Sequence, residues 1–390
     1  MQAKKKIMIL INTLMHGGAE RIVFDIADKI NKEDFDLHIV YMKDHKYFKE
    51  GNKKSFLDDL KNVDVKITCL GGKNKDAIKE SIALWKLLRI EKPDVLHTFL
   101  PYAGTIGRVV GKLAGIKSIL AVQCNLKMAQ ASKTYWLDRI TLPLVDAWTG
   151  ATEWIEEEYN GKSSYFSIEK WQMGRRHFTV LAGVDVDDIS RVIKNTDVFK
   201  KRNEIGIKDN NQVVSMCARM VGWKGHGDLI NAFSFLPQNV ELVLIGGGQR
   251  MEEFQNLAKK LSVFDRVHFL GDRDDLLEIL AITDVYVQSY TRATDGTVWK
   301  GPNTSQMIAG ASKISAVSTN VPMIEHFMQD GISGKIADLN NPEDLAKKIK
   351  YLLDNKEGAK KMADNAFEIV SKNYSLKSML YSYENIYKLL

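Results

Sequence analysis

The sequence predicts an α/β protein made of two similar halves, each a mostly parallel β-sheet covered by helices, with a crevice between the halves. The chain has 390 residues, a length that suits two domains of ordinary size. In both halves, apolar runs of strand length alternate with segments of helical period, which is typical of parallel sheets with crossover helices. A polar stretch through Asn210 separates the two series and suits an interdomain crossing.

The composition indicates a protein with substantial cores, since 45% of the residues are hydrophobic and 27% are charged. The net charge of +6 is compatible with anionic substrates or an anionic membrane surface, but it is too weak to indicate nucleic-acid binding. The cysteines, Cys69, Cys124 and Cys217, are scattered. The sequence therefore predicts neither a disulfide framework nor a zinc site, and it favours a reducing cytoplasm.

The N-terminal stretch is basic and then apolar, as in a signal peptide. It contains Asn12 and Thr13 and lacks a small-residue cleavage site, so we interpret it as a first strand. No run of about eighteen apolar residues follows anywhere in the chain. We therefore expect no transmembrane helix and only peripheral association with a membrane.

Apolar runs give the expected strands, at Lys6–Leu10, Leu37–Val40, Val65–Cys69, Val95–His97, Ser118–Val122, Thr179–Leu181, Val213–Cys217, Val240–Ile245, Val267–Leu270, Val285–Gln288 and Ser315–Val317. Helical periodicity gives the expected helices, after the Gly17-Gly18 turn and at Ile78–Ile90, Tyr102–Ala114, 228–235, Arg250–Leu261, 274–282 and 303–311, with a further helix starting at Pro342. The segment Asn160–His177 lacks periodicity and is rich in aromatic and basic residues, so we expect an irregular segment or a mobile flap.

These elements predict an N-terminal domain over residues 1–185 and a C-terminal domain over residues 186–372. Residues 373–390 form an amphipathic helix carrying Tyr381, Tyr383 and Tyr387. We expect this helix to pack back towards the N-terminal domain.

The stretch Val213–Phe233 combines a buried strand, a loop with two cations, and a helix. Arg219 and Lys224 lie five residues apart beyond the carboxyl end of the strand, where open α/β sheets bind ligands. Such a pair suits a diphosphate, because Arg grips oxygens bidentately and Lys adds a compact point charge. Taken alone, the pair also fits a loop with two ordinary solvated cations.

The chain resembles the retaining glycosyltransferases of family 4 in an ordered series of motifs. These are HGGAER near the start, AGVD at 182–185, ARMVGWKGHGDLI, LVLIGGGQR, RVHFLGDRDDL, ITDVYVQSY and DGISGKIADLNNPEDLAKKI. The resemblance covers nearly the whole chain and implies the GT-B fold, in which two Rossmann-like domains face a central cleft.

The resemblance implies that Arg219 and Lys224 are catalytic. They would hold the diphosphate of a nucleotide sugar and stabilise the negative charge that develops as the glycosidic C–O bond breaks. It also implies a reaction that needs no metal or other cofactor, with the nucleotide-diphosphate sugar as co-substrate. The backbone at Gly17 and Gly18 would approach the donor phosphate at a helix start, although a tight strand–helix turn explains these glycines equally well.

Three further positions of the C-terminal half are implied in donor binding. Gly247 lies in a turn near the nucleotide, and the main chain of Arg273 lies near the base with Asp275 close by. The acidic residues here also fit an exposed helix N-terminus, so both interpretations stay open.

The chain departs from the family at its paired glutamates, E-x7-E. In a gap-free alignment, Trp299 and Met307 take the two positions. The first glutamate normally contacts the transferred sugar and the second the ribose of the nucleotide. Asp295 or Gln306 would substitute only after a local shift, and Gln306 carries no charge.

Three polar residues next to these positions are also donor-binding candidates. Asn303, Thr304 and Ser305 offer an amide and hydroxyls at the start of a helix, which suits phosphate or sugar hydroxyls. They are equally good helix-capping residues.

A second departure concerns a cleft histidine found in many relatives. This chain has Gln123, Cys124 and Asn125 near that point, and His97 is the nearest alternative. A lone histidine at a strand end also fits a structural role.

The sequence therefore predicts a retaining, metal-independent glycosyltransferase that moves a sugar from a nucleotide-diphosphate sugar to a glycan or lipid-linked acceptor in surface polysaccharide or glycoconjugate synthesis. The alternative, favoured by the lost glutamates, is a degenerate GT-B protein that binds nucleotide sugar or acts as a partner subunit of a glycan-assembly complex. Another GT-B enzyme, such as a sugar-nucleotide epimerase, fits less well. We expect a cytoplasmic protein at the inner face of the membrane, with the segment Tyr165–His177 as a candidate contact with anionic lipid.

Overall fold

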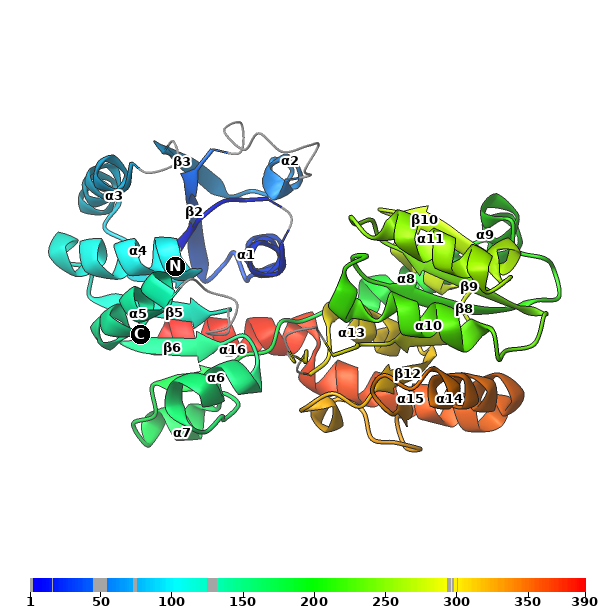
Figure 1. Cartoon of the computed structure of the whole chain (residues 1–390). Coiled ribbons are helices and arrows are strands. Elements are labelled where there is room, and N and C mark those ends of the chain that lie inside the picture. The colour runs from blue at the N-terminus through cyan, green and yellow to red at the C-terminus, as the bar shows by residue number, and fades with distance from the viewer. Residues whose placement is uncertain are drawn as a thin grey trace. The chain divides into compact units, whose positions relative to one another are not determined.

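The computed structural model describes residues 3–15, 17–44, 55–72, 76–124, 132–292, 296, 298–299 and 301–390. The chain divides into two compact units (Figure 1). Unit 1 consists of Met1–Gly183 together with Leu376–Leu390, and unit 2 is Val184–Ser375. Each unit is an α/β sheet structure, so the predicted fold class is confirmed.

Unit 1 is built on a seven-stranded parallel sheet in the order β3-β2-β1-β4-β5-β6-β7. The strands are β1 Lys5–Ile11, β2 Phe35–Lys43, β3 Lys66–Gly72, β4 Val95–Phe99, β5 Ser118–Gln123, β6 Ala147–Gly150 and β7 His177–Thr179. Ile7 of β1 is opposite Leu37 on one side and Val95 on the other. The direction of the strand order reverses between β1 and β4, so the switch point of the sheet lies at the carboxyl ends of these two strands.

Helices cover both faces of this sheet (Figure 1). One face packs against α1 Gly18–Lys29, α2 Phe56–Leu60 and the C-terminal helix α16 Leu376–Leu389. The opposite face packs against α3 Ala77–Glu91 and α4 Pro101–Ala114, and α5 Ser132–Thr141 lies beside α4. Because β-strand side chains alternate between faces, Ile9 belongs to the first core and Leu10 to the second.

The segment Asn160–His177, expected to be irregular or mobile, is an ordered part of unit 1. It follows α6 Glu153–Asn160 and contains α7 Ile168–Gln172, where Trp171 is buried. The buried carboxylate of Glu156 accepts hydrogen bonds from Arg175 Nη2 at 2.7 Å and from Thr179 Oγ1 at 2.7 Å. Arg176 lies over the ring of Trp171 at 4.4 Å. The periodicity is absent because these polar and aromatic contacts, and not an amphipathic stripe, hold the segment.

A buried ion pair fixes α5 against α4. Arg108 Nη2 lies 2.9 Å from Asp138 Oδ1, and both side chains are almost fully excluded from water. Arg108 Nη1 also donates to the backbone oxygen of Asp138 at 2.9 Å, and the hydroxyl of Tyr159 donates to Asp138 Oδ2 at 3.0 Å. Burial lowers the pKa of Arg108, and the charge of Asp138 opposes that shift.

Unit 2 is built on a six-stranded parallel sheet in the order β10-β9-β8-β11-β12-β13. The strands are β8 Gln212–Cys217, β9 Val240–Ile245, β10 Val267–Gly271, β11 Val285–Gln288, β12 Ser315–Thr319 and β13 Lys335–Ala337. Val214 of β8 is opposite Leu242 and Val285. The order reverses between β8 and β11, as it does at the corresponding edge of unit 1.

The main helices of unit 2 are α8 Val186–Asn195, α9 Val198–Ile205, α10 His226–Phe233, α11 Met251–Lys260, α12 Leu276–Leu280, α13 Thr304–Ala311, α14 Pro342–Asp354 and α15 Lys356–Asn373. The polar stretch that suited a domain crossing thus folds as α8 and α9. Among the described residues of these two helices, Ile189 is the one buried side chain, and Ile207 follows α9 as a second buried residue, so the sequence of this stretch resembles that of a linker. Within the described residues, no helix is both long enough and apolar enough to cross a membrane.

We expect Asp138→Ala to lower the free energy of unfolding of unit 1 by about 3–5 kcal/mol, because it leaves the Arg108 guanidinium buried and unpaired. The matched control is Glu91→Ala, which removes the more exposed Lys66–Glu91 pair of the same unit. In this control variant, the free energy of unfolding should fall by less than about 1 kcal/mol. Urea unfolding followed by far-UV circular dichroism measures both, and equal effects would contradict a structural role for the buried pair.

Candidate functional site

The loops that follow β8, β9, β10 and β11 meet at the carboxyl edge of the unit 2 sheet. Parallel strands place all these loops at one edge, and the loop after β8 emerges beside β11, at the switch point. This loop carries Arg219 and Lys224. The residues singled out at 246–248, 271–275 and 303–306 follow the neighbouring strands.

The path of the β8 loop depends on Gly225. A short 3-10 turn at Gly222–Lys224 ends there, and Gly225 has a φ of +79°. A Cβ at this position would lie 1.5 Å from the backbone oxygen of Ser289, which follows β11. Only glycine allows this contact, and the contact brings Lys224 next to the end of β11.

The ammonium group of Lys224 lies among three aromatic rings, which we call the aromatic box. Lys224 Nζ is 4.4 Å from the ring centroid of Trp223, 5.0 Å from that of Tyr290 and 4.6 Å from that of Trp299. The rings of Trp223 and Trp299 stack at 5.0 Å, and those of Tyr290 and Trp299 at 6.0 Å. Cation–π attraction to these faces offsets part of the cost of removing the ammonium group from water.

Lys224 lacks an anionic partner in the described part of the chain. Its exposure is 8%, and no described carboxylate lies within ion-pair distance. Burial and, to a smaller extent, the charge of Arg219 together lower the pKa of Lys224 to about 8. Arg219 itself is exposed and forms no ion pair with a described residue. Two neighbouring cations without a carboxylate are an arrangement that an anionic ligand stabilises.

The glycine turn after β9 packs directly on the β8 loop. Gly246 has a φ of +119°, and a Cβ there would lie 2.4 Å from the backbone oxygen of Ala218. The N–H of Gly247 donates to Asp272 Oδ1 at 2.7 Å, and its carbonyl accepts from the N–H of Met220 at 2.8 Å. The turn therefore supports the loop that carries Arg219, and the Gly247 amide already has a partner.

The side chains of Arg273 and Asp275 belong to a charged network with α9. Asp275 Oδ2 lies 2.8 Å from Lys201 Nζ, and Arg273 Nη2 lies 2.6 Å from Glu204 Oε1. Hydrogen bonds from Arg273 and Lys201 hold the pKa of Asp275 far below its usual range. This pairing leaves the Arg273 main chain, and not its side chain, for a ligand.

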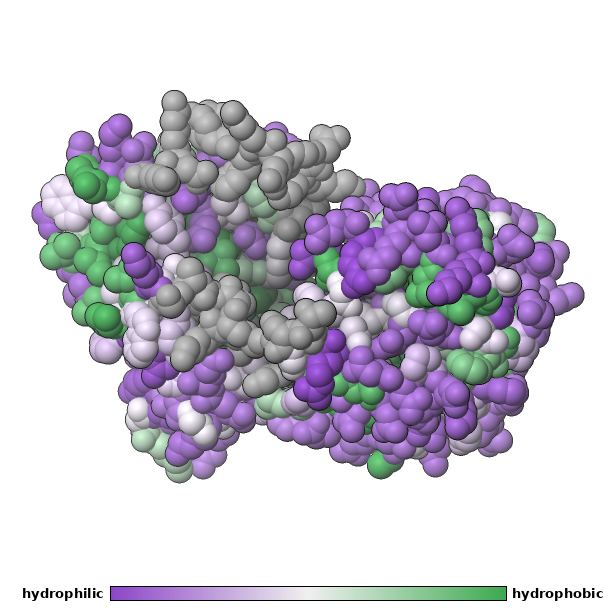
Figure 2. Space-filling model, in the orientation of Figure 1, coloured by the Kyte–Doolittle hydropathy of each residue, from purple (hydrophilic) through white to green (hydrophobic). Residues whose placement is uncertain are grey.

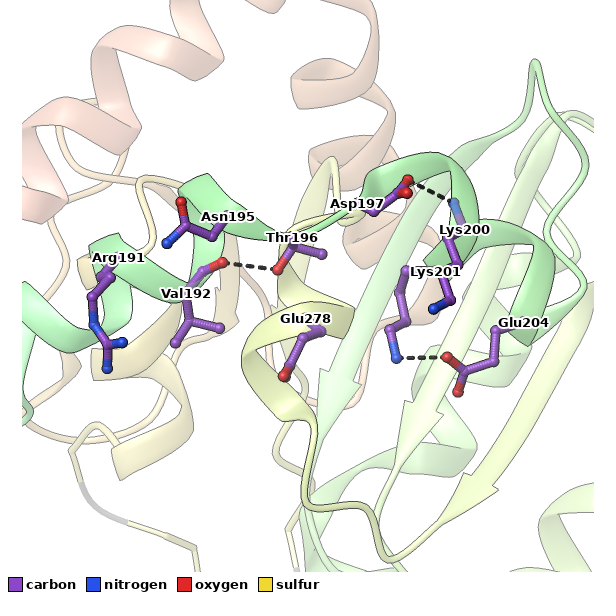
Figure 3. A pocket seen from close by; sticks show the side chains of 9 residues that line it. All are labelled: Arg191, Val192, Asn195, Thr196, Asp197, Lys200, Lys201, Glu204 and Glu278. Carbon is purple, nitrogen blue, oxygen red and sulfur yellow. Dashed lines mark hydrogen bonds and ion pairs between the residues drawn. The ribbon is translucent and has the colours of Figure 1, made fainter.

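Lys201 also lines a cavity of about 410 Å³ between α8, α9 and α12 (Figure 3). The close-up shows Lys201 Nζ joined to Glu204 and the Asp197 side chain joined to the amide of Lys200. The cavity contains none of the predicted site residues. Of its charged side chains, Lys201 pairs with Glu204, and Arg191 pairs with Asp188 beside the cavity.

Asn303 and Gln306 form the capping box of α13. Gln306 N donates to Asn303 Oδ1 at 2.8 Å, and Asn303 N donates to Gln306 Oε1 at 3.0 Å. The Gln306 amide also donates to Ser318 Oγ at 3.1 Å, and Gln306 is buried. The capping interpretation therefore describes both side chains, and Gln306 has no group left to replace a glutamate.

The remaining candidates of this segment differ in exposure. The Ser305 hydroxyl interacts with Cys217 and Tyr286, whereas Thr304 is exposed at the start of α13. Met307, at the second glutamate position, is buried, and Trp299, at the first, belongs to the aromatic box. Asp295 lies outside the described residues.

In unit 1, the candidates near the strand ends have structural surroundings. Gly17 precedes α1, and a Cβ there would lie 2.3 Å from Glu20 Oε2, so this carboxylate covers the glycine turn. Burial raises the pKa of Glu20. Glu20 lies in the HGGAER motif but is not among the site residues predicted from the sequence.

His97 and Cys124 do not offer reactive groups. His97 is fully buried, and its Nδ1 lies 2.6 Å from the hydroxyl of Tyr387 on α16. Burial lowers the pKa of His97 to about 3 and raises that of Cys124 to about 12. The candidate cleft residue His97 is instead a core residue, because α16 covers it. Asn125 lies outside the described residues.

The main feature that the sequence analysis missed is the aromatic box. Trp223 stands next to Lys224 in the sequence and could have indicated it, but Tyr290 and Trp299 both come from the loop between β11 and α13. Among the described residues, no group of three or more His, Cys, Asp or Glu side chains is placed to hold a metal ion.

The two parallel sheets, each with a switch point, form the GT-B fold. The structure of HepE from Anabaena in complex with UDP superposes with a TM-score of 0.80 at 17% identity, covering 99% of this chain and 100% of that one. A glycosyltransferase from Rickettsia africae gives a TM-score of 0.79 at 19% identity, covering 99% and 98%. At these identities, the likeness shows the fold alone.

Two family models match separate parts of the chain, one in each half. Glycosyltransferase Family 4 matches residues 16–162, and Glycosyl transferases group 1 matches residues 197–369. An Escherichia coli protein, UDP-Gal:alpha-D-GlcNAc-diphosphoundecaprenol alpha-1,3-galactosyltransferase, is 21% identical over 381 residues, covering 93% of each chain. LpsE of Rhizobium meliloti, a lipopolysaccharide core biosynthesis glycosyltransferase, is 30% identical over 171 residues, covering 44% of this chain and 48% of that protein. The chain belongs to the family 4 glycosyltransferases, which transfer sugars with retention of configuration.

The low pKa of Lys224 predicts a pH-dependent affinity for nucleoside diphosphates. The diphosphate anion binds the ammonium form of Lys224, so the affinity should be highest well below about pH 8. It should fall as the pH rises through the pKa that Lys224 has in the ligand-free protein, and the slope should approach about tenfold per pH unit. Titration calorimetry with UDP between pH 6.5 and 9.5 measures this. Lys224→Arg should remove the dependence, because a guanidinium stays charged. A wild-type affinity that is constant over this range would contradict the assignment.

Proposed function

We propose that this chain is an active retaining glycosyltransferase that takes a sugar from a UDP-sugar and adds it to a lipid-linked glycan acceptor in surface polysaccharide synthesis. The observation that carries the proposal is the pair of cations on the β8 loop, Arg219 exposed and Lys224 buried without a described carboxylate partner. A protein that had lost nucleotide-diphosphate binding would have no reason to keep a desolvated ammonium group at this edge.

The relatives support the choice of donor and acceptor. The name of the Escherichia coli relative specifies a UDP-linked galactose donor and a diphosphoundecaprenol-linked acceptor, and its match spans 93% of each chain. HepE, which shares the fold, has been solved with UDP-glucose. We therefore propose a uridine nucleotide, with the sugar and the linkage left to experiment.

In the proposed mechanism, the bond between the anomeric carbon and the β-phosphate oxygen breaks while an acceptor hydroxyl attacks the same face of the sugar. The new bond joins the acceptor oxygen to the anomeric carbon, and the hydroxyl proton passes to the leaving diphosphate. Arg219 and Lys224 stabilise the charge that grows on this diphosphate, and Lys224 does so from a site with little water. The negative charge of the diphosphate also raises the pKa of Lys224 back towards its ordinary value, so that the side chain stays protonated.

Trp299 gives the donor site a different contact from that of a glutamate. A ring that covers Lys224 at 4.6 Å lies beside the proposed diphosphate and presents an apolar face. We propose that the transferred sugar lies against this face, so that C–H packing replaces the hydrogen bonds that a carboxylate would accept. The exposed hydroxyl of Thr304 and the amides at the start of α13 remain for phosphate oxygens.

A second candidate function is a nucleotide-sugar binder or partner subunit without turnover. The observation that favours it is the replacement of both family glutamates by Trp299 and Met307, of which Met307 is buried. Such a protein would bind UDP-sugar but release no UDP.

For the enzyme, we expect Lys224→Ala to lower kcat/KM about 100–1000-fold, the usual effect of removing one group that stabilises a developing anion. The measurement is UDP release from a panel of UDP-sugars with a lipid-linked glycan acceptor. The control is Lys200→Ala, an exposed lysine of the same unit outside the site, which should keep wild-type activity. A thermal shift with UDP but no turnover in the wild type would favour the partner subunit.

We expect Trp299→Ala to raise KM for the UDP-sugar by about 3–30-fold, the range for losing one aromatic contact with a desolvated cation and its ligand. Because the variant admits water to Lys224, the pH at which UDP affinity begins to fall should also rise. Trp299→Phe keeps a ring at this position and should lie near the wild type. An unchanged KM in Trp299→Ala would remove the proposed sugar contact.

A further inference from the structure

Unit 1 exposes a contiguous apolar surface on the helices α3, α4 and α5. The helices lie side by side, with α4 in the middle, on the sheet face opposite α16. Their exposed apolar side chains, which we call the α3–α5 face, are Ile78, Ile82 and Trp85 of α3, Val109 and Leu113 of α4, and Trp136, Leu137 and Ile140 of α5. Figure 2 shows hydrophobic surface gathered over α4 and α5.

The exposure of this face is too regular to be a scatter of single surface residues. Ile78, Ile82 and Trp85 recur at helical spacing and form one stripe, while Leu84 and Leu88 of the same helix are fully buried in the core. Ile78 is 78% exposed, and Leu113 and Ile140 are 74% and 70% exposed. The outward stripe of a helix that already buries its inner one is usually polar. Contiguous apolar surface of this kind marks an interaction site.

The charges beside the face are positive. The exposed basic residues of these helices and their ends are Lys79, Lys86, Arg89, Lys92, Lys112, Lys117 and Lys133. The acidic residues of the same helices are engaged: Glu80 is buried and accepts from the Tyr102 hydroxyl, Asp138 pairs with Arg108, and Glu91 pairs with Lys66. At the helix ends, Asp146 pairs with Lys112, and Asp76 and Asp94 leave the basic residues in excess. A partner for this face should therefore be apolar and negatively charged.

A basic cavity opens where α3 and α4 end. Its volume is about 500 Å³, and its lining includes Lys5, Arg89, Lys92 and Lys117. Two anionic groups also line it: Asp94, whose Oδ2 accepts from the amide of Lys6 at 2.8 Å, and the carboxyl group of Leu390, which accepts from Ser118 Oγ at 2.7 Å. In the chain, the exposed residue Ile90 directly follows Arg89 of this lining and the exposed residue Leu113 directly precedes Ala114, so apolar side chains adjoin the basic ones.

We propose that the α3–α5 face docks the protein onto an anionic lipid bilayer. The apolar side chains enter the interfacial region, and the basic cavity receives an anionic lipid headgroup. Trp85 and Trp136, each partly exposed, have the side chain that favours this depth, and the Cζ of Arg89 lies 5.9 Å from the Trp85 ring centroid. This places membrane contact away from the segment Tyr165–His177, where Trp171 is buried and Arg175 pairs with Glu156.

A lipid surface fits better than a protein partner because the apolar residues protrude from three helices with lysines between them. Protein interfaces deplete lysine, whereas membrane-surface helices combine aromatic, aliphatic and lysine side chains. The inference is independent of the proposed donor site. It deepens the proposed function, since a lipid-linked acceptor lies at such a surface.

The test is co-sedimentation of the full chain with vesicles of phosphatidylcholine alone and with 30% phosphatidylglycerol, a fraction of about this size giving a clearly anionic surface. We expect binding to the anionic vesicles that weakens with salt. The variant Ile82→Ser/Leu113→Ser/Ile140→Ser should lower the partition coefficient at least about tenfold, as should Lys86→Glu/Lys117→Glu. The control is Phe199→Ser/Phe235→Ser, which removes exposed apolar residues of unit 2 and should bind as the wild type.

Absence of binding to anionic vesicles would overturn the inference. It would also be overturned if the face variants bound as the wild type, or if they changed the sedimentation coefficient of the free protein, which would assign the face to a second copy. UDP release in solution with a detergent-dispersed acceptor tests the donor site separately. Face variants that lose vesicle binding while keeping this activity separate the two proposals.

Discussion

The candidate site of unit 2 depends on Lys224, a lysine that is kept from water although no described residue supplies a carboxylate to pair with it. The ammonium group of Lys224 lies between aromatic rings from two loops, those that follow β8 and β11, and its position is fixed by Gly225, whose contact with Ser289 excludes any other residue. Burial of a charge is costly unless something compensates it. Here the faces of the aromatic rings offset part of this cost. The pKa of Lys224 is lowered because the rest of the cost is not offset. A diphosphate completes the compensation, which is why we place the donor there.

At the carboxyl edge of the unit 2 sheet, the backbone geometry of the family's site is kept, while the side chains at the two glutamate positions differ. The switch point, the glycine turn and the capped start of α13 are present, and they hold the β8 loop through backbone contacts. The glutamate positions carry a tryptophan in the aromatic box and a buried methionine. We therefore expect the change to alter how the donor sugar is held, while the phosphate contacts made by Arg219 and Lys224 stay.

Unit 1 uses its two helical layers differently. Helix α16 seals one sheet face and buries His97, Tyr383 and Tyr387 together. The opposite layer buries the Arg108–Asp138 pair beneath it and leaves apolar side chains outside. A buried ion pair costs more than a hydrophobic contact, but it fixes α5 against α4 and so keeps the α3–α5 face continuous. The function that we infer for this unit, docking on a lipid surface, lies on the outer side of the layer formed by α3, α4 and α5.

Sequence alone determined the fold class, the family and the order of most strands and helices. Alternating apolar runs and helical stripes are local signals, and ordered motifs need no knowledge of contacts. Local signals failed where few side chains are buried, as in α8 and α9, or where polar contacts replace an apolar stripe, as around Glu156.

Only the tertiary structure decided what each candidate residue does. Asn303 and Gln306 satisfy a helix end, Arg273 and Asp275 bind the side chains of α9, and His97 is covered by a helix 290 positions along the chain. Lys224 gained its neighbours in the same way, from loops that meet only when β8 and β11 pair. Burial and partners decide whether a polar group is free to act, and both come from contacts between distant segments that a sequence pattern does not contain.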